Sequence, residues 1–262
     1  ACVTVGIQPL RRILGNAVKA ATGLIGTTEP YLKWGLNYAK RERTENDRVF
    51  FVSYPDGGIA TSLSKDSRWK EFENYEGVTC CFFGQFGRLV DFDTVIVAAA
   101  ICQKENVKVR FLLCGKGELL EQYQKKVENM QLHNVYLPGW VNKTDIADIG
   151  YVSDAGLMAY KHDDNFNMQM PNKFSEYLSL GLAILLQPTG IMENVISKNK
   201  CGVRYENAMQ LYEVIKQMAT DKGQLAQMKQ NSRKLFEDEF SVGKVYKEYG
   251  EYILQNAKKM DY

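Results

Sequence analysis

The residues best suited to chemistry lie in one short stretch that begins at Pro171 and Asn172. Proline suits the first turn of a helix, and the free backbone N–H groups of such a turn can bind an anion. Lys173 adds a cation there, and Glu176 follows one turn later. A carboxylate in that place can accept hydrogen bonds from two ribose hydroxyls while the helix start and the lysine hold phosphates. The same i, i+3 spacing also allows a simple ion pair on a buried amphipathic helix.

The residues around this pair predict the helix that must carry it. Phe174, Tyr177 and Leu178 fall on one face at i, i+3 and i+4, and Gly181 is a typical residue to end a helix. Residues 183–186 then form a short apolar run, which is typical of a buried strand. A turn that contains proline and glycine separates this strand from the next helix.

Strand and helix patterns alternate regularly through the second part of the chain. Short apolar runs typical of buried strands are separated by longer runs with helical periodicity. This alternation predicts an α/β fold with a parallel, doubly wound sheet, in which ligands bind at the carboxyl ends of the strands. The predicted strands are 78–83, 107–114, 134–137, 154–159 and 183–186, and the helices between the first four are 92–102, 118–130 and 143–149. Outside this region, the periodicity predicts helices over 9–21 and 207–258 and one within the polar stretch 59–76. It also predicts a strand over 48–53 that ends at the turn 54–58.

The loop after the first of these strands has the composition of a phosphate site. Gly84 and Gly87 would let the backbone approach a phosphate closely, and Arg88 could clamp it as a bidentate donor. A tight turn with a solvated arginine is the structural alternative. The loop after the second strand, Gly115-Lys-Gly117, is interpreted as mainly structural.

Two further loops carry aromatic or titratable groups. Trp140 follows the third strand and could stack on a base, although a large aromatic residue there is as often packing. His162 lies in the polar loop 160–167, where it could touch a ligand or be a bystander. Asp163 and Asp164 could bind a cation, but two adjacent acids in a loop are usually solvated. We find no Ser-His-Asp set, no Cys-His pair and no convincing metal cluster.

Composition excludes several classes of protein. The 262 residues are 45% hydrophobic and 24% charged, which is ordinary for a chain that folds around a core. A formal charge of +2 gives no case for nucleic acid as a partner. No apolar run reaches the length of a membrane span, and no signal peptide is visible. The six cysteines show no CxxC pair, which favours reduced thiols in a cytoplasm.

The stretch 171–181 resembles the donor-site helix of the glycosyltransferase family 4 enzymes, which have the GT-B fold. That family has a Glu, seven residues, a second Glu, and then small residues that end in Gly. Glu176 matches the second Glu, so the resemblance implies that it binds the ribose of a nucleotide. Met168 stands where the first, sugar-reading Glu is expected. The chain therefore departs from the family at that position.

Other loops resemble the family in the same order. Gly84 to Arg88 is similar to its Gly-Arg loop, but the following Lys-Gly is absent, and Lys173 would have to supply that charge. The turn that ends in Val141 is similar to the one whose backbone reads the nucleotide base. The turn 190–193 is similar to the loop that places a glycine and a glutamate, here Glu193, near the donor. A first-turn acid that favours the helix dipole is the alternative for Glu193.

The resemblance also divides the chain. Residues 1–58 are similar to the close of an acceptor-side Rossmann-like domain, 59–76 to a linker, and 77–240 to a nucleotide-sugar-binding domain. Residues 241–262 would form a helix that crosses back toward the first domain. One more αβ layer of a single domain is the alternative for residues 1–58. Because the chain starts inside apparent structure, we expect it to be a fragment or a processed product.

The implied reaction is sugar transfer from a nucleoside diphosphate, most often UDP, with retention of configuration. Arg88 and Lys173 would stabilise the leaving phosphates, and neither a metal nor another cofactor is expected. The implied acceptor is a glycan or a polyprenyl-linked oligosaccharide in bacterial surface polysaccharide synthesis. The expected location is the cytoplasm, with peripheral contact at the inner membrane face through the missing N-terminal part. A GT-B sugar-nucleotide epimerase and a non-catalytic nucleotide-binding module are the alternatives.

Overall fold

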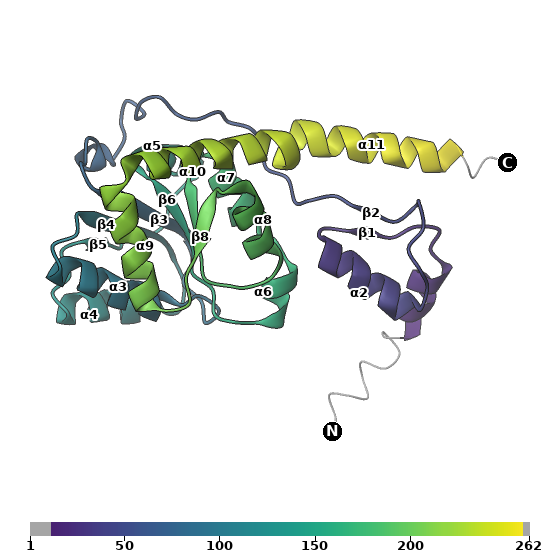
Figure 1. The fold of residues 1–262 in the computed structure, drawn as a ribbon, viewed down its shortest axis with the longest axis horizontal. Helices are drawn as coiled ribbons and strands as arrows, with labels where there is room; N and C mark the ends of the chain where they lie inside the picture. Colours follow the sequence, from purple (N-terminus) through teal and green to yellow (C-terminus); the bar gives the residue numbers. More distant parts are fainter. Residues whose placement is uncertain (1–11, 259–262) are drawn as a thin grey trace, which may run out of the picture.

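A six-stranded parallel sheet forms the centre of the larger lobe in the computed structural model, which describes residues 12–258 (Figure 1). The strand order is β5-β4-β3-β6-β7-β8. The first strand therefore lies in the middle and the two halves of the sheet grow outward from it, which is the Rossmann order. The strands are β3 (Val78–Gln85), β4 (Val109–Lys116), β5 (Val135–Tyr136), β6 (Ala155–Met158), β7 (Ala183–Leu186) and β8 (Gly202–Arg204).

Helices cover both faces of this sheet (Figure 1). Cys80 and Phe82 point into a core on one face, while Cys81 and Phe83 point into a separate core on the other. This burial on both sides is why the strands are continuously apolar. One core includes residues of α3 (Phe92–Lys104), α4 (Leu120–Asn129) and α9 (Ala208–Thr220), and the other includes residues of α5 (Lys143–Val152), α7 (Asn172–Ser179) and α8 (Ile191–Asn199).

The remaining elements of the larger lobe are shorter or lie at its margin. A helix of five residues, α6 (Asp164–Met168), stands just before α7. Helix α10 (Lys222–Leu235) packs against α7 and β7 and continues into a π-helical turn, Phe236–Phe240. Trp69 and Phe72, at either end of a single 3₁₀ turn (Lys70–Phe72), are buried against the sheet domain.

A small αβ unit forms the second lobe. Residues 12–20 are helical, and β1 (Ile25–Gly26) and β2 (Arg48–Val49) pair in parallel around α2 (Glu29–Ala39). The side chain of Thr28 caps α2 by accepting the N–H of Tyr31. Asp47 is buried and receives both terminal nitrogens of Arg41, each at 2.7 Å. This pairing is the main reason that the pKa of Asp47 lies well below its usual range.

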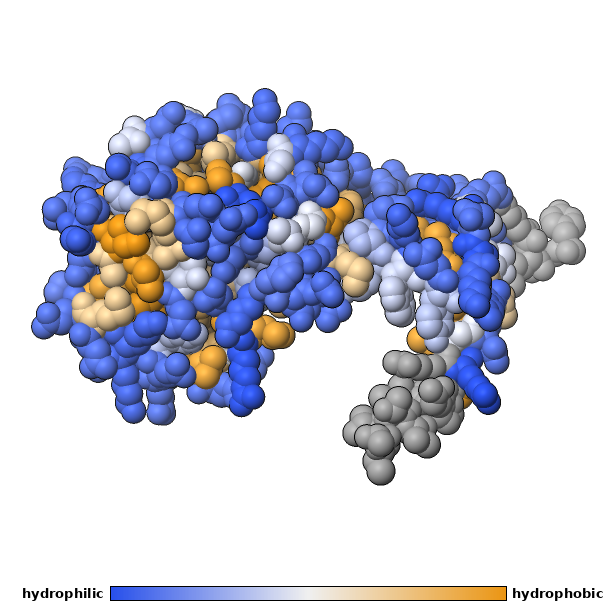
Figure 2. Space-filling model, turned by 60° about the horizontal axis from the view of Figure 1, so that its bottom comes forward, coloured by the Kyte–Doolittle hydropathy of each residue, from blue (hydrophilic) through white to orange (hydrophobic). Residues whose placement is uncertain are grey.

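Two segments connect the lobes, and they meet at Tyr54. The N–H of Tyr54 donates to Phe240 O at 3.0 Å, and Tyr54 O accepts the N–H of Val242 at 3.1 Å. Helix α11 (Val242–Lys258) then runs out over the αβ unit, where the Phe50 ring contacts two of its tyrosines. Figure 2 shows the two unequal lobes and the narrow connection, with hydrophilic residues over most of the visible surface.

The doubly wound parallel sheet predicted from the sequence is confirmed, and every strand predicted between residues 78 and 187 is present. The short edge strand β8 was missed. The predicted strand 48–53 pairs only at Arg48–Val49, because the chain then leaves the small sheet to cross between lobes. The helical run predicted over 207–258 is interrupted at Asp221 and again at 236–241. A helix predicted from residue 9 is described only from residue 12.

Other local predictions differ in detail. The predicted helix within 59–76 is only the 3₁₀ turn, and the predicted loop 160–167 contains the start of α6. Pro171 takes the position before the first turn of α7 rather than a place inside it. In the described part of the chain, no helix combines the length and the apolar character that a membrane crossing requires.

A glycine holds two strand ends close together, and its replacement should destabilise the fold. A Cβ built at Gly115 would overlap the carbonyl oxygen of Gly84. The positive φ of Gly115 is also one that residues with a side chain rarely adopt. We expect Gly115→Ala to lower the free energy of unfolding by about 1–3 kcal/mol in urea titrations. Gly250→Ala is the matched control, because its Cβ would enter open space in α11 and should add about 1 kcal/mol. Equal stability of the two variants would contradict this account.

Candidate active site

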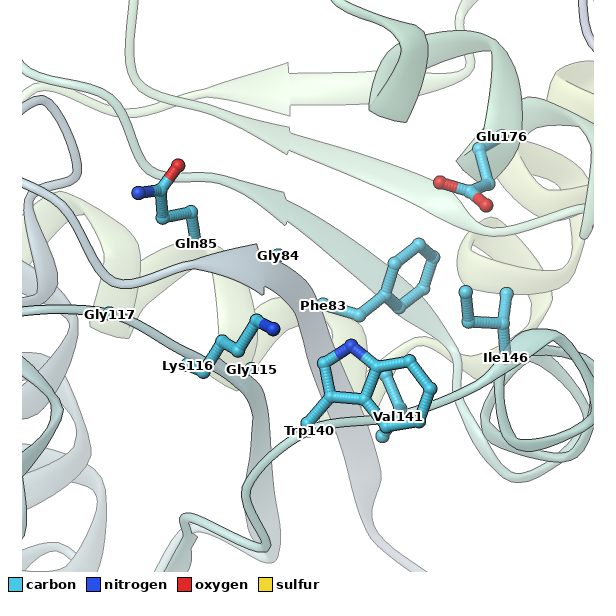
Figure 3. Close-up of a pocket in the computed structure, with 10 residues that line it drawn as sticks. All are labelled: Phe83, Gly84, Gln85, Gly115, Lys116, Gly117, Trp140, Val141, Ile146 and Glu176. Carbon is cyan, nitrogen blue, oxygen red and sulfur yellow. The ribbon is translucent and has the colours of Figure 1, made fainter.

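A cavity of about 630 Å³ opens at the carboxyl ends of β3 and β4 (Figure 3). Its walls come from these two strand ends, from the turn after β5, from α5 and from α7. This is the side of a doubly wound sheet on which ligands bind, next to the point where the strand order reverses between β3 and β6. The lining residues are Phe83, Gly84, Gln85, Gly115, Lys116, Gly117, Trp140, Val141, Ile146 and Glu176.

Backbone hydrogen bonds fix the floor of this cavity. The N–H of Gly115 donates to Gly139 O at 2.7 Å, which joins the end of β4 to the turn that carries Trp140. The N–H of Phe86 donates to Lys116 O at 2.8 Å, which joins the end of β3 to the end of β4. Three successive strand ends are thus held against one another, and they define the shape of the cavity.

Glu176 forms one wall of the cavity. It lies in the middle of α7, half-buried, and its Oε1 accepts the hydroxyl of Tyr54 at 2.5 Å. Burial raises the pKa of the Glu176 carboxyl, and the Tyr54 hydrogen bond and the charge of Lys173 oppose that rise. The carboxylate is therefore held in a defined place at the edge of the cavity (Figure 3).

Lys173 lies beside the cavity at the start of α7. Its Nζ is 3.4 Å from the centre of the Phe82 ring and 5.7 Å from that of Tyr160. A Cβ at Gly84 would lie 2.5 Å from this nitrogen, so the glycine makes room for the ammonium group. Burial lowers the pKa of Lys173 to about 7, against the opposing effect of Glu176. Such a lysine is a poorly solvated cation that an anionic ligand would stabilise.

Lys116 and Trp140 face Glu176 across the cavity. Figure 3 shows the Lys116 amine and the Trp140 indole on one side and the Glu176 carboxylate on the other. Trp140 keeps 59% of its surface exposed, while Val141 beside it is buried. Arg68 holds the turn by donating to Trp140 O at 2.9 Å and to the Asp145 carboxylate. An exposed indole on a fixed turn can stack on a flat ligand.

Four predicted site residues line this cavity: Gly84, Trp140, Val141 and Glu176. Arg88 does not, because its side chain is 83% exposed and its Nε donates to Glu118 Oε1 at 3.2 Å. Gly87 lies in the same exposed loop, also outside the lining. The proposed phosphate role of this loop stays a prediction.

The other predicted site residues lie around α7 without lining the cavity. Pro171 precedes the helix and Asn172 is exposed at its first position. His162 is exposed in the loop after β6. Glu193 lies in the first turn of α8, where its Oε1 is 3.8 Å from the Arg204 guanidinium. The binding roles of these residues also stay predictions.

Sequence reasoning missed two polar groups that the structure brings to the site. Lys116 was assigned to a structural turn, although its position at a predicted strand end was a usable signal. Tyr54 was assigned to the turn that ends the predicted strand 48–53, and its contact with Glu176 spans 122 residues, so no local pattern indicates it. Within residues 12–258, no group of three or more His, Cys, Asp or Glu side chains could hold a metal ion.

One known protein family matches the part of the chain that forms this site. The family model for glycosyl transferases group 1 matches residues 64–235, which is most of the larger lobe. The chain belongs to this family. The glycosyl transferases group 1 match covers the cavity and every strand of the six-stranded sheet.

Solved structures share the GT-B fold of this glycosyltransferase chain. Anabaena Alr3699/HepE in complex with UDP has a TM-score of 0.78 at 15% identity, over 95% of this chain and 68% of that one. A Staphylococcus aureus TarM mutant complex has a TM-score of 0.68 at 17% identity, over 94% of this chain and 46% of TarM. The C-terminal domain of Francisella tularensis LpcC has a TM-score of 0.56 at 13% identity, over 69% of this chain and 96% of that one.

The buried lysine of this glycosyltransferase chain should make its stability depend on pH. Below pH 7 Lys173 is protonated in both states, and the folded state bears the full cost of the buried charge. Between pH 7 and 10.5 the folded state releases the proton first, because its pKa is about 7 against an ordinary 10.5, so the free energy of unfolding rises. We expect a rise on the order of a few kcal/mol, measured by urea unfolding.

Lys173→Met should remove this rise, because methionine fills a similar volume without a charge. Lys161→Met, which changes an exposed lysine of a neighbouring loop, should follow the parent chain. If Lys173→Met kept the pH dependence of the parent, Lys173 would not be its source.

Proposed function

We propose that this chain binds the donor of a glycosyltransferase reaction, in which a sugar leaves a nucleoside diphosphate, with UDP as the nucleotide. The observation that carries this proposal is the cavity at the strand ends, with the Glu176 carboxylate on one wall and the Lys173 ammonium beside it. Its volume of about 630 Å³ is in the range that small-molecule ligands occupy. HepE, which has the same fold, was solved with UDP and with UDP-glucose.

The cavity offers a place for each part of such a donor. The base would lie against Trp140 and Val141, and the ribose hydroxyls would donate to Glu176. The diphosphate would lie at the start of α7, where free N–H groups and the helix dipole favour an anion. Lys173 would pair with it, and Lys116 faces the same space (Figure 3). Arg88 lies farther out and would reach the phosphates only through a change of rotamer.

The chemistry follows from the charge of the leaving group. Breaking the bond from the sugar to the phosphate leaves negative charge on the phosphate, and fixed positive groups lower the energy of that state. Lys173 suits this role because burial lowers its pKa to about 7, and a bound anion would raise that pKa again so that the amine takes up a proton from solvent and is fully charged. His162 and Glu193 would lie near the sugar. We propose that transfer retains the configuration of the sugar, which is of hexose type.

The acceptor side of the proposal rests on the family resemblance. We propose a glycan or polyprenyl-linked acceptor, as in bacterial surface polysaccharide synthesis. The reaction would take place in the cytoplasm, with peripheral contact at the inner face of the membrane. These assignments concern the whole protein, of which this chain would supply the donor-binding part.

A second candidate is a non-catalytic nucleotide-binding module. Met168 favours it, because this residue supplies no carboxylate or hydroxyl where the family usually reads the sugar. The two candidates differ in turnover. A glycosyltransferase should slowly hydrolyse or transfer from UDP-sugars, whereas the module should bind UDP without consuming any donor.

Calorimetric titration with UDP, GDP, ADP and CMP tests the proposal. We expect UDP to bind most tightly, because the diphosphate and the base have separate sites in the cavity. Binding of CMP should be weaker, since it lacks the second phosphate. If none of the four nucleotides bound to the chain, the proposed donor site would be wrong.

Glu176→Gln should weaken UDP binding by roughly 5- to 30-fold, because hydrogen bonds to a charged acceptor are stronger than those to a neutral one by about 1–2 kcal/mol. Glu73→Gln is the matched control, because Glu73 lies in the linker and not in the cavity. Its carboxylate accepts the hydroxyl of Tyr151 at 3.3 Å. Titration calorimetry of both variants measures the difference. Equal affinities for the two variants would exclude Glu176 as the ribose ligand.

A further inference from the structure

The carboxylate on the cavity wall is held by a residue that does not belong to the sheet domain. Tyr54 donates its hydroxyl to Glu176 Oε1 at 2.5 Å, and it comes from the segment that crosses between the lobes. Among the described residues, Tyr54 is the hydrogen-bond partner of this carboxylate. Glu176 Oε2 is thus left for a ligand, and each carboxylate oxygen can accept more than one hydrogen bond.

Hydrogen bonds hold the backbone of Tyr54 as well as its hydroxyl. Its N–H donates to Phe240 O and its carbonyl accepts the N–H of Val242, so that the outgoing and returning segments are joined at this residue. These bonds place the phenol at one point relative to the start of α11. A side chain anchored in this way can orient the group to which it donates.

The segment 168–176 also contacts the crossing chain and the small lobe. Ser175 donates its hydroxyl to Val52 O at 2.6 Å, and Thr28 donates its hydroxyl to Met168 O at 2.5 Å. Ser175 and Thr28 are both fully buried. The donor-site helix is therefore also the surface on which the junction of the lobes rests.

We propose that Tyr54 is a positioning residue of the donor site, which orients the Glu176 carboxylate toward the ribose hydroxyls and ties it to the junction of the two lobes. This inference rests on the proposed function. Tyr54 does not touch the ligand. It sets the rotamer of Glu176, and without its hydroxyl the carboxylate would lose its fixed direction and turn toward solvent.

The test compares UDP with 2′,3′-dideoxy-UDP, which lacks the hydroxyls that Glu176 would bind. The parent chain should bind UDP more tightly than the dideoxy analogue. Tyr54→Phe keeps the ring and removes only the hydroxyl. We expect it to weaken UDP binding about tenfold and binding of the analogue less than twofold, as measured by calorimetry, because only UDP uses the oriented carboxylate.

Two control variants separate positioning from a general structural effect. Tyr151→Phe removes another hydroxyl that donates to a glutamate, here Glu73, away from the cavity. Ser175→Ala removes a junction hydrogen bond without changing the partner of the carboxylate. Both should keep the preference of the parent for UDP over the analogue, and thermal melting of each variant checks that it is folded.

The outcomes distinguish failure of this inference from failure of the proposed function. If Tyr54→Phe weakened both ligands equally, or behaved like Tyr151→Phe, Tyr54 would not position the carboxylate, while the donor site would stand. If the parent bound both ligands equally, the ribose role of Glu176 would be wrong, and the inference with it. If the parent bound neither ligand, the donor site itself would be wrong.

Discussion

Helices cover both faces of the six-stranded sheet, so its strands carry apolar side chains on both faces. Polar groups that could bind a ligand therefore lie at the strand ends. Cys80 and Phe82 fill one core while Cys81 and Phe83 fill the other, so β3 is apolar from Cys80 to Phe83, directly before Gly84. The cavity lies where this apolar run stops. Glycines at these ends let three loops approach one another closely enough to form its floor.

The same burial changes the properties of the groups beside the cavity. Removal of water from around Lys173 lowers its pKa to about 7, and removal of water from around Glu176 raises the pKa of its carboxyl. In each case burial disfavours the charged form, and each group offsets part of that effect in the other. An anion bound near Lys173 would favour its charged form, which burial disfavours. The charge states of Lys173 and Glu176 therefore depend on how closely the surrounding residues pack.

The junction of the lobes depends on the same helix. Helix α7 carries Glu176 on its cavity side and Ser175 on the side that meets the crossing segment. Arg233 reinforces that segment through two hydrogen bonds to Asp56 and one to Ser179 O. This arrangement connects the geometry of the cavity with the relative placement of the lobes.

Much of the sheet domain could be predicted from local sequence patterns. Continuous apolar runs bounded by glycines indicate buried parallel strands, and the i, i+3, i+4 spacing of Phe174, Tyr177 and Leu178 indicates the helix that carries Lys173 and Glu176. These signals depend on neighbouring residues. The small lobe was predicted less well, because β2 ends where the chain leaves its sheet, which is a tertiary event.

The sequence by itself determined the alternation of strands and helices, the polar strand ends and the family to which the donor helix is similar. Only the tertiary structure decided that Lys116 lies in the cavity wall while Arg88 points into solvent and pairs with Glu118. It also decided that Tyr54 meets Glu176 and that Lys173 is buried against Phe82. The physical reason is that burial and long-range hydrogen bonds depend on how distant segments pack, which no local spacing encodes.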